Sequence, residues 1–182
     1  MCTFHLIGED GMYTNLAFML SEQCTHMIKL AVFEGSKKSV FKDRRELLGS
    51  LLEQLEEAFD YIDRYNRTRA EFSGLDRLDM RDYPFSGAAL ISIFEDRIEF
   101  VSIGGLVKGI ALDDVMLGVS ALRNQHLANI FYRLRLIEAY GTGILKINEC
   151  YDNYVVKPVI ETTSNKLNNH CNLTCGAPCA PV

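Results

Sequence analysis

The chain has 182 residues, of which 48% are hydrophobic and 24% charged, and its formal net charge is −5. This length and composition are ordinary for one globular domain with a single hydrophobic core. The negative charge gives no general attraction to nucleic acid, and there is no apolar run of the roughly 18 residues that a membrane span requires. The first ten residues have no basic region before their apolar patch, so no secretory signal is expected and the cytoplasm is the predicted compartment.

The first part of the chain predicts a short helix, two strands and a long helix. The short helix is expected over Tyr13 to Ser21, a strand over Met27 to Phe33, and a short pairing strand around Ser39 to Lys42. The long helix begins at Ser50, because Ser50 and Glu53 have the spacing of a capping box and an apolar face follows. The residues of that face are Leu51, Leu52, Leu55, Ala58, Phe59 and Ile62.

The middle of the chain predicts an extended segment, a short link and a hairpin. Thr68 to Met80 is expected to be extended, and Arg81 to Gly87 is the link. The runs Ala88 to Phe94 and Arg97 to Ser102 are rich in β-formers and flank a polar tip, as in a β-hairpin.

Two glycine turns follow the hairpin and are candidates for a phosphate site. Gly104, Gly105 and Gly109 allow positive φ and close approach of the backbone, and Gly141-Thr142-Gly143 opens the last predicted helix. Glycine turns beside a sheet edge, one of them at a helix N-terminus, can bind a phosphate. Taken alone, the same glycines also fit an ordinary strand-ending turn and a connection between two helices.

The rest of the chain predicts two further helices, an edge strand and a disordered tail. A short helix is expected over Leu112 to Leu117, and Asn124 caps the next one. The apolar face of that second helix consists of Leu127, Ile130, Phe131 and Leu134. Val155 to Ile160 predicts a final strand, at an edge because of Pro158. Residues 166–182 lack a periodic apolar face and are predicted to be disordered.

No metal site and no catalytic residue are predicted. Cys171, Cys175 and Cys179 recur at a spacing of four, which is not that of a zinc knuckle. The acidic residues of the long helix lie mostly opposite its apolar face and are expected to be solvated.

Several short motifs of this chain together resemble a known family. They are Asp96-Arg-Ile-Glu-Phe-Val-Ser, Gly104-Gly-Leu, Gly118-Val-Ser, Arg123-Asn124, Leu127-Ala, Phe131-Tyr-Arg-Leu, Leu136-Ile-Glu and Tyr140-Gly-Thr-Gly-Ile. In these motifs the chain is similar to the divergent GHKL-type ATPase domain of Schlafen/AlbA-type transcriptional regulators, which is related to the C-terminal part of the helicase RecG. The resemblance covers about Gly8 to Asn165 and is densest between Gly87 and Tyr151.

The chain departs from the pattern of this family in the link after the extended segment. Family members carry a helix there, whose Glu and Asn are expected to polarise the attacking water and to hold Mg²⁺. Here Asp82-Tyr-Pro84 runs directly into Phe85-Ser-Gly87, which leaves no room for a three-turn helix. Arg135 also stands where the family has a glycine, at the left-handed position that ends a helix.

These observations predict an α/β two-layer sandwich with a mixed sheet and helices mainly on one face. Residues 1–165 are expected to form one GHKL-like domain, truncated at its N-terminus. The resemblance implies a weak or lost ATP-binding module of a transcriptional regulator, in which Mg²⁺ could accompany ATP and hydrolysis is absent. The residues that this comparison assigns to the nucleotide are Gly104, Gly105, Gly109, Arg123, Asn124, Gly141, Thr142 and Gly143.

The family resemblance also predicts the binding partners. Nucleic acid would be bound only through an AlbA-like domain and a winged helix that this chain does not encode, and no membrane contact is expected. The alternative function is a catalytically silent scaffold. It would pair with a second copy or with a larger intact relative through an exposed apolar surface, formed by the predicted hairpin of residues 88–102 and the gap left by the lost helix. A third possibility is a remnant of marginal stability without activity.

Overall fold

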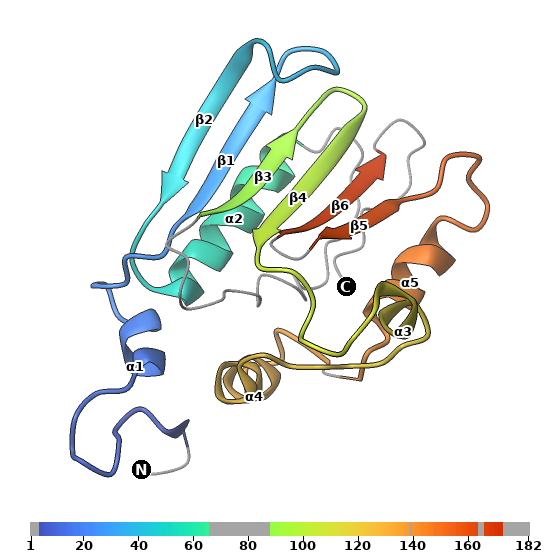
Figure 1. Ribbon diagram of the computed structural model, residues 1–182. Helices are drawn as coiled ribbons and strands as arrows, with labels where there is room; N and C mark the ends of the chain where they lie inside the picture. Colours follow the sequence, from blue (N-terminus) through green and yellow to red (C-terminus); the bar gives the residue numbers. More distant parts are fainter. Residues whose placement is uncertain (1–3, 66–87, 139, 164–165, 173–182) are drawn as a thin grey trace.

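The computed structural model describes residues 4–65, 88–138, 140–163 and 166–172, and its centre is a six-stranded sheet (Figure 1). The strand order is β2-β1-β3-β4-β6-β5, in which β1 and β3 are parallel and all other neighbours are antiparallel. The strands are β1 (Ile28–Phe33), β2 (Phe41–Leu47), β3 (Ala89–Ile93), β4 (Arg97–Ile103), β5 (Val159–Thr163) and β6 (Lys166–Asn172). The helices are α1 (Asn15–Met19), α2 (Leu51–Tyr65), α3 (Leu112–Met116), α4 (Gln125–Arg133) and α5 (Gly143–Cys150).

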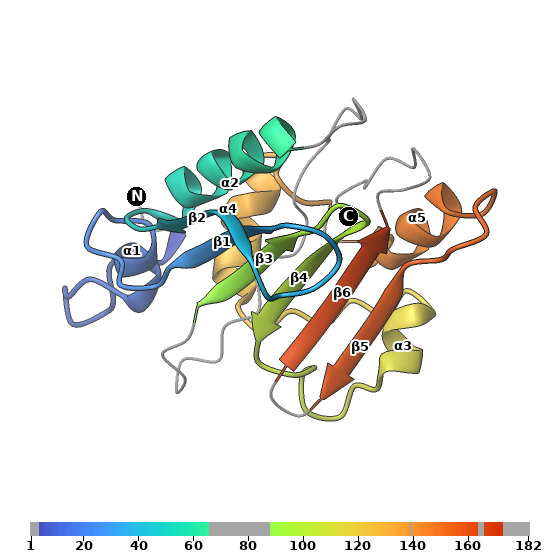
Figure 2. The same ribbon diagram turned by 90° about the horizontal axis from the view of Figure 1, so that it is seen from above.

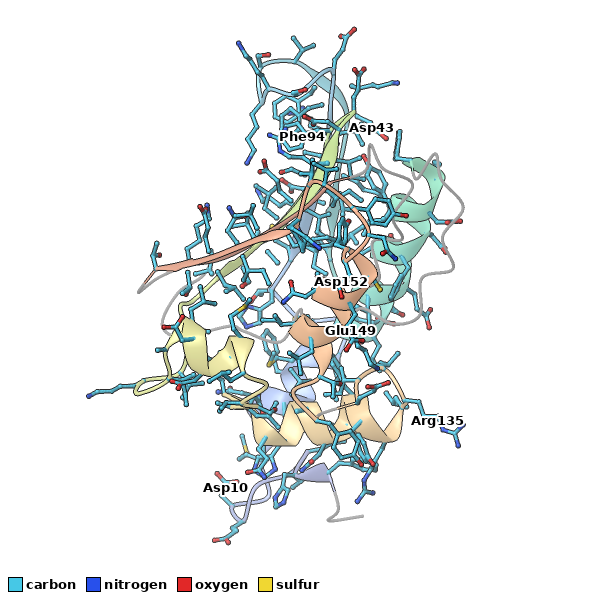
Figure 3. The ribbon with its side chains drawn as sticks, turned by 90° about the vertical axis from the view of Figure 1, so that its right-hand side faces the viewer. Asp10, Asp43, Phe94, Arg135, Glu149 and Asp152 are labelled. Atoms are coloured by element: carbon cyan, nitrogen blue, oxygen red, sulfur yellow. The ribbon has the colours of Figure 1, made fainter. Side chains whose placement is uncertain are left out.

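Helices α2 and α5 pack on the same face of the sheet (Figure 3). The main core lies between them and the strands, and includes Ile28, Leu30, Val32, Ala58, Tyr61, Ile62, Ile91, Ile93, Ile98, Ile147 and Tyr151. Alternate residues of β1 and of β3 reach this core, as the two-residue period of a β-strand requires. The structure thus confirms the predicted α/β fold with a mixed sheet covered by helices.

The long helix α2 forms as its sequence indicates. It begins after Ser50, whose Oγ accepts a hydrogen bond from the backbone N–H of Leu52 at 3.3 Å. Leu55, Ala58 and Ile62 are buried, as the spacing predicted. Gln54 is buried with them, and its amide donates to the carbonyls of His26 and Gly49 at 2.8 and 2.7 Å, which fixes the start of the helix against the sheet.

A second, smaller cluster joins α1 to α4. It contains Leu16 and Met19 of α1 together with Leu127, Ala128, Ile130, Phe131 and Ile137. Leu134, predicted to belong to this apolar face, is instead 51% exposed, because α4 ends at Arg133. Arg135 has a φ of 59°, so the left-handed position after this helix is occupied by a non-glycine residue, as predicted.

The opposite face of the sheet is covered at one end by the β1–β2 connection (Figure 2). Glu99 of β4 is 4% exposed there, and its carboxylate contacts Lys38 Nζ at 2.7 Å and Arg97 Nε at 2.9 Å. The Arg97 guanidinium also lies over the ring of Phe94, 4.0 Å from its centroid. The Lys38–Glu99 ion pair and the hydrogen bond from Arg97 Nη1 to the Ser36 carbonyl hold the β1–β2 connection against the sheet. Lys38 and Arg97 together compensate the buried carboxylate.

The sheet corrects the prediction for the end of the domain. Residues 166–172, predicted to begin a disordered tail, form β6 between β4 and β5, so the sheet extends beyond residue 165. This strand has little apolar periodicity, and its backbone pairs with neighbours on both sides. The predicted final strand is shifted as well: β5 begins at Val159, after Pro158, and Val155 is 98% exposed. Its predicted place at a sheet edge is confirmed.

The hairpin is also placed differently from the surface proposed for pairing. Strands β3 and β4 do form an antiparallel hairpin, but they lie inside the sheet between β1 and β6. Their residues Ile91, Ile93 and Ile98 are at most 3% exposed. The hairpin therefore does not present the exposed apolar surface that was expected, because these three isoleucines belong to the core.

Two further predictions lie outside the described residues. These are the extended segment of residues 68–80 and the link of residues 81–87. Within the described residues, no helix has the length and apolar character needed to cross a lipid bilayer.

Candidate functional site

The first candidate loop follows β4. Gly104 is buried and has a φ of 103°, a conformation that favours glycine. Gly105 is buried beside it. Gly109 has a φ of 89°, but it is exposed, and a Cβ built there would have no neighbour within 4 Å. Gly104 and Gly105 are thus packed into the molecule, whereas Gly109 only turns the chain.

Arg123 connects this loop to the segment before α4. Its Nη2 donates to the backbone carbonyl of Leu106 at 2.9 Å and also to that of Gly105. A guanidinium satisfies two carbonyls well, because its donors are fixed in a plane. Arg123 was predicted to face a phosphate, but in this structure it holds the loop after β4.

Asn124, the next residue, caps α4. Its Oδ1 accepts a hydrogen bond from the backbone N–H of Leu127 at 3.0 Å, as the sequence predicted. The side-chain oxygen of Asn124 therefore satisfies one of the helix amides that have no partner within the helix.

The second glycine loop is packed directly against the segment after α3. Gly141 has a φ of 69°, and a Cβ at this position would lie 2.2 Å from the carbonyl oxygen of Gly118. Real Cβ atoms essentially never come this close to another heavy atom. Gly118 itself has a φ of 90°. Glycine at position 141 is therefore required by the packing of two backbone segments, before any ligand is considered.

Thr142 and Gly143 stand at the start of α5. Thr142 is the N-cap residue, but its side chain makes no capping hydrogen bond. Its Oγ1 instead donates to Glu138 Oε2 at 3.2 Å, and Lys146 Nζ contacts the same carboxylate oxygen. The hydrogen bonds from Lys146 and Thr142 hold the pKa of the Glu138 carboxyl below its usual value.

The structure brings most of the predicted site residues into one unit of three loops. We call residues 104–106, 118–124 and 140–143 the three-loop unit. Arg123 joins the first loop to the second, and the contact between Gly118 and Gly141 joins the second to the third. In Figure 1 these loops lie at one end of the sheet, among α3, α4 and α5. Gly109 lies apart from these contacts.

Sequence reasoning named the motifs of Gly118 and Glu138 but assigned neither residue to the site, and it missed Lys146. For Glu138 and Lys146 a signal was available, because each lies four residues from Thr142, on opposite sides along the chain. The contact of Gly118 with Gly141 had no local signal, since the two glycines are far apart in the sequence.

The donors at the start of α5 suit an anionic group. The first turn of α5 contains no acidic residue, and the Thr142 hydroxyl and the Lys146 ammonium converge on one carboxylate oxygen. Helix N-termini favour negative charge through their unsatisfied N–H groups. In contrast, no group of three or more His, Cys, Asp or Glu side chains that could hold a metal ion occurs among the described residues. The side chains at the start of α5 therefore offer donors that an anion such as phosphate can accept.

Comparisons with known proteins agree with an ATPase-like fold. Residues 88–168, slightly less than half of the chain, match a family model described as "Putative ATP-dependent DNA helicase recG C-terminal". The match supports the ATPase-like family that the motifs indicated, and it includes all three loops of the three-loop unit. No curated protein matches the chain.

A solved structure shows the same fold. The DIP2311 protein from Corynebacterium diphtheriae superposes with a TM-score of 0.71 at 18% sequence identity, over 93% of this chain. The chain spans only 39% of the length of that protein.

Proposed function

We propose that this chain is an ATP-binding module in which the three-loop unit binds the nucleotide phosphates. The proposal is carried by the start of α5, where the Thr142 hydroxyl and the Lys146 ammonium both contact one carboxylate oxygen, Glu138 Oε2. The family match over residues 88–168 supports ATP as the anion.

The binding is proposed to be weak. Residues 81–87 are too few to hold the Glu/Asn helix of the family that the chain resembles, so the residue that would hold Mg²⁺ in that family has no counterpart here. An anion site open to water is strongly screened by salt. We expect a dissociation constant on the order of 1 mM, about 4 kcal/mol.

Calorimetric titration with ATP and ADP, with and without Mg²⁺, tests this proposal. Thr142→Val should weaken binding, since it removes the hydroxyl but keeps the shape of the side chain. Thr163→Val, on the exposed edge strand β5, is the matched control and should bind like the wild type. Micromolar, Mg²⁺-dependent binding would show that another residue has taken over the metal and that the weak-binding proposal is wrong.

Hydrolysis of ATP is expected to be absent. Phosphoryl transfer needs charge stabilisation by a metal and a residue that positions the attacking water, and the sequence lacks the helix expected to supply both. The measurement is phosphate release by purified protein, compared with the Gly141→Val, Gly143→Val double variant. Turnover in the wild type that disappears in the double variant would contradict this expectation.

A role in transcriptional regulation would depend on further domains. We propose that a nucleic-acid-binding domain acts together with this module in the cytoplasm, because the net charge of −5 does not favour direct binding of nucleic acid. The prediction is that the chain alone shows no retention of duplex DNA in a gel-shift assay at physiological salt.

A second candidate function is pairing with another copy of the chain. Apolar side chains are exposed on the segment that leaves α3: Leu117 is 82% exposed, Val119 42% and Leu122 41%. Exposed apolar groups that lie close together often mark protein–protein contacts. Light scattering after gel filtration, with Leu117→Ser as the variant, separates a dimer from a monomer.

A further inference from the structure

This inference rests on the proposed function and concerns the regulation of the same site. We propose that the carboxylate of Glu138 takes the place of a phosphate at the start of α5 when no nucleotide is bound. A nucleotide phosphate would displace it and take over the contacts with Thr142 and Lys146.

The contacts of Glu138 are those that an anion would make. Its Oε2 accepts a hydrogen bond from Thr142 Oγ1 at 3.2 Å and is also in contact with Lys146 Nζ. Thr142 occupies the N-cap of α5, yet its side chain makes no hydrogen bond to the helix amides. Glu138 therefore engages the two side chains that would otherwise be available to a ligand at this helix end.

The contact is suited to being displaced. The side chains of Glu138 and Lys146 are 53% and 46% exposed, and exposed ion pairs are weak because water screens them. A phosphate carries more negative charge than a carboxylate and accepts more hydrogen bonds, so it forms the stronger contact with a hydroxyl and an ammonium. The two anions also repel each other, so they cannot share the position.

The backbone beneath this contact is fixed. Gly141, which precedes Thr142, is packed against Gly118 with no space for a Cβ. Thr142 therefore keeps its place when the Glu138 side chain leaves. Displacement requires only rotation of one half-exposed side chain, and the carboxylate acts as an internal competitor of the nucleotide.

The test is calorimetric titration of the full chain with ATP, for the wild type and for Glu138→Gln. The glutamine keeps the size of the side chain and removes its charge. We expect ATP to bind about 3- to 5-fold more tightly to Glu138→Gln, the range of a weak surface charge interaction. Adding Lys146→Met to this variant should abolish the gain.

Glu149→Gln is the matched control. Glu149 lies in the last turn of the same helix, at the end opposite Thr142 (Figure 3). Glu149→Gln changes the net charge of the chain by the same amount as Glu138→Gln. If its affinity for ATP is close to that of the wild type, a general charge effect is excluded. An equal gain for both glutamine variants would overturn the inference.

The remaining outcomes separate the two proposals. If the wild type binds ATP and Glu138→Gln binds it equally or less tightly, the inference that Glu138 competes with the nucleotide is wrong, and the proposed function stands. If none of the variants binds ATP at any concentration up to about 10 mM, the proposed function is wrong and the inference falls with it.

Discussion

The sheet with α2 and the three-loop unit are stabilised in different ways. The sheet is held by a continuous layer of buried aliphatic and aromatic side chains, from Ile28 of β1 to Ile98 of β4. The three-loop unit is held by a few specific contacts, chiefly Arg123 with two carbonyls and Gly118 with Gly141. The first arrangement spreads its stability over many residues, and the second concentrates it in single groups. A substitution in the loops should therefore affect the site while the sheet stays folded.

The largest effect is expected in the sheet. Ile91 is 1% exposed in the central strand β3, and Ile91→Ala should lower the free energy of unfolding by about 3 kcal/mol because it leaves a cavity. Urea denaturation measures this change. Leu134→Ala, at a position 51% exposed, is the control and should change stability by no more than about 0.5 kcal/mol. Equal costs at the two positions would mean that the sheet does not contain the main core.

A smaller loss is expected from Gly141→Ala. The added Cβ would overlap the carbonyl of Gly118, so the two loops must separate, at a cost of about 2 kcal/mol in the free energy of unfolding. Gly109→Ala also faces a positive φ, but it has open space, and should cost only about 1 kcal/mol. Thermal unfolding of both variants gives the comparison. Similar costs would show that strain in the backbone, and not contact between the loops, explains the glycine at position 141.

Arg123→Gln tests the first link of the three-loop unit. It removes the hydrogen bonds to Gly105 and Leu106 and should lower the free energy of unfolding by about 1.5 kcal/mol, the cost of losing a hydrogen-bonded charge at a half-buried site. Hydrogen exchange should increase in the 104–106 loop and remain unchanged in β1 and β3. Faster exchange across the whole sheet would contradict the separation of the two regions.

The smallest effect concerns pH. The pKa of Glu138 is lowered in the folded protein, first by its hydrogen bond with Lys146 and then by that with Thr142. The contact therefore stabilises the folded state above the unfolded pKa of the carboxyl, and this contribution is lost as pH falls through the lower folded pKa. NMR titration of the Glu138 carboxyl carbon should show its pKa rising toward the usual value in Lys146→Ala. An unchanged titration would exclude the contact in solution.

The sequence alone was sufficient where neighbouring residues decide the structure. Helix α2 follows from its apolar spacing, the β3–β4 hairpin from two β-rich runs around a polar tip, and the start of α4 from the capping side chain of Asn124. The left-handed conformation of Arg135 was predicted too, from the family resemblance, which places a glycine at this helix end. In each case the deciding interaction joins residues close in sequence, so the pattern contains the information.

Only the tertiary structure decided the features that join distant segments. The polar residues 166–172 form β6 because their backbone pairs with β4 on one side and β5 on the other. Their sequence has no apolar pattern that would predict a strand. The same pairing places the β3–β4 hairpin inside the sheet, between β1 and β6. The partners of Arg123 and the contact of Gly141 with Gly118 depend likewise on how the three loops meet. A sequence shows which groups can donate, accept or turn, and long-range packing decides which of them come into contact.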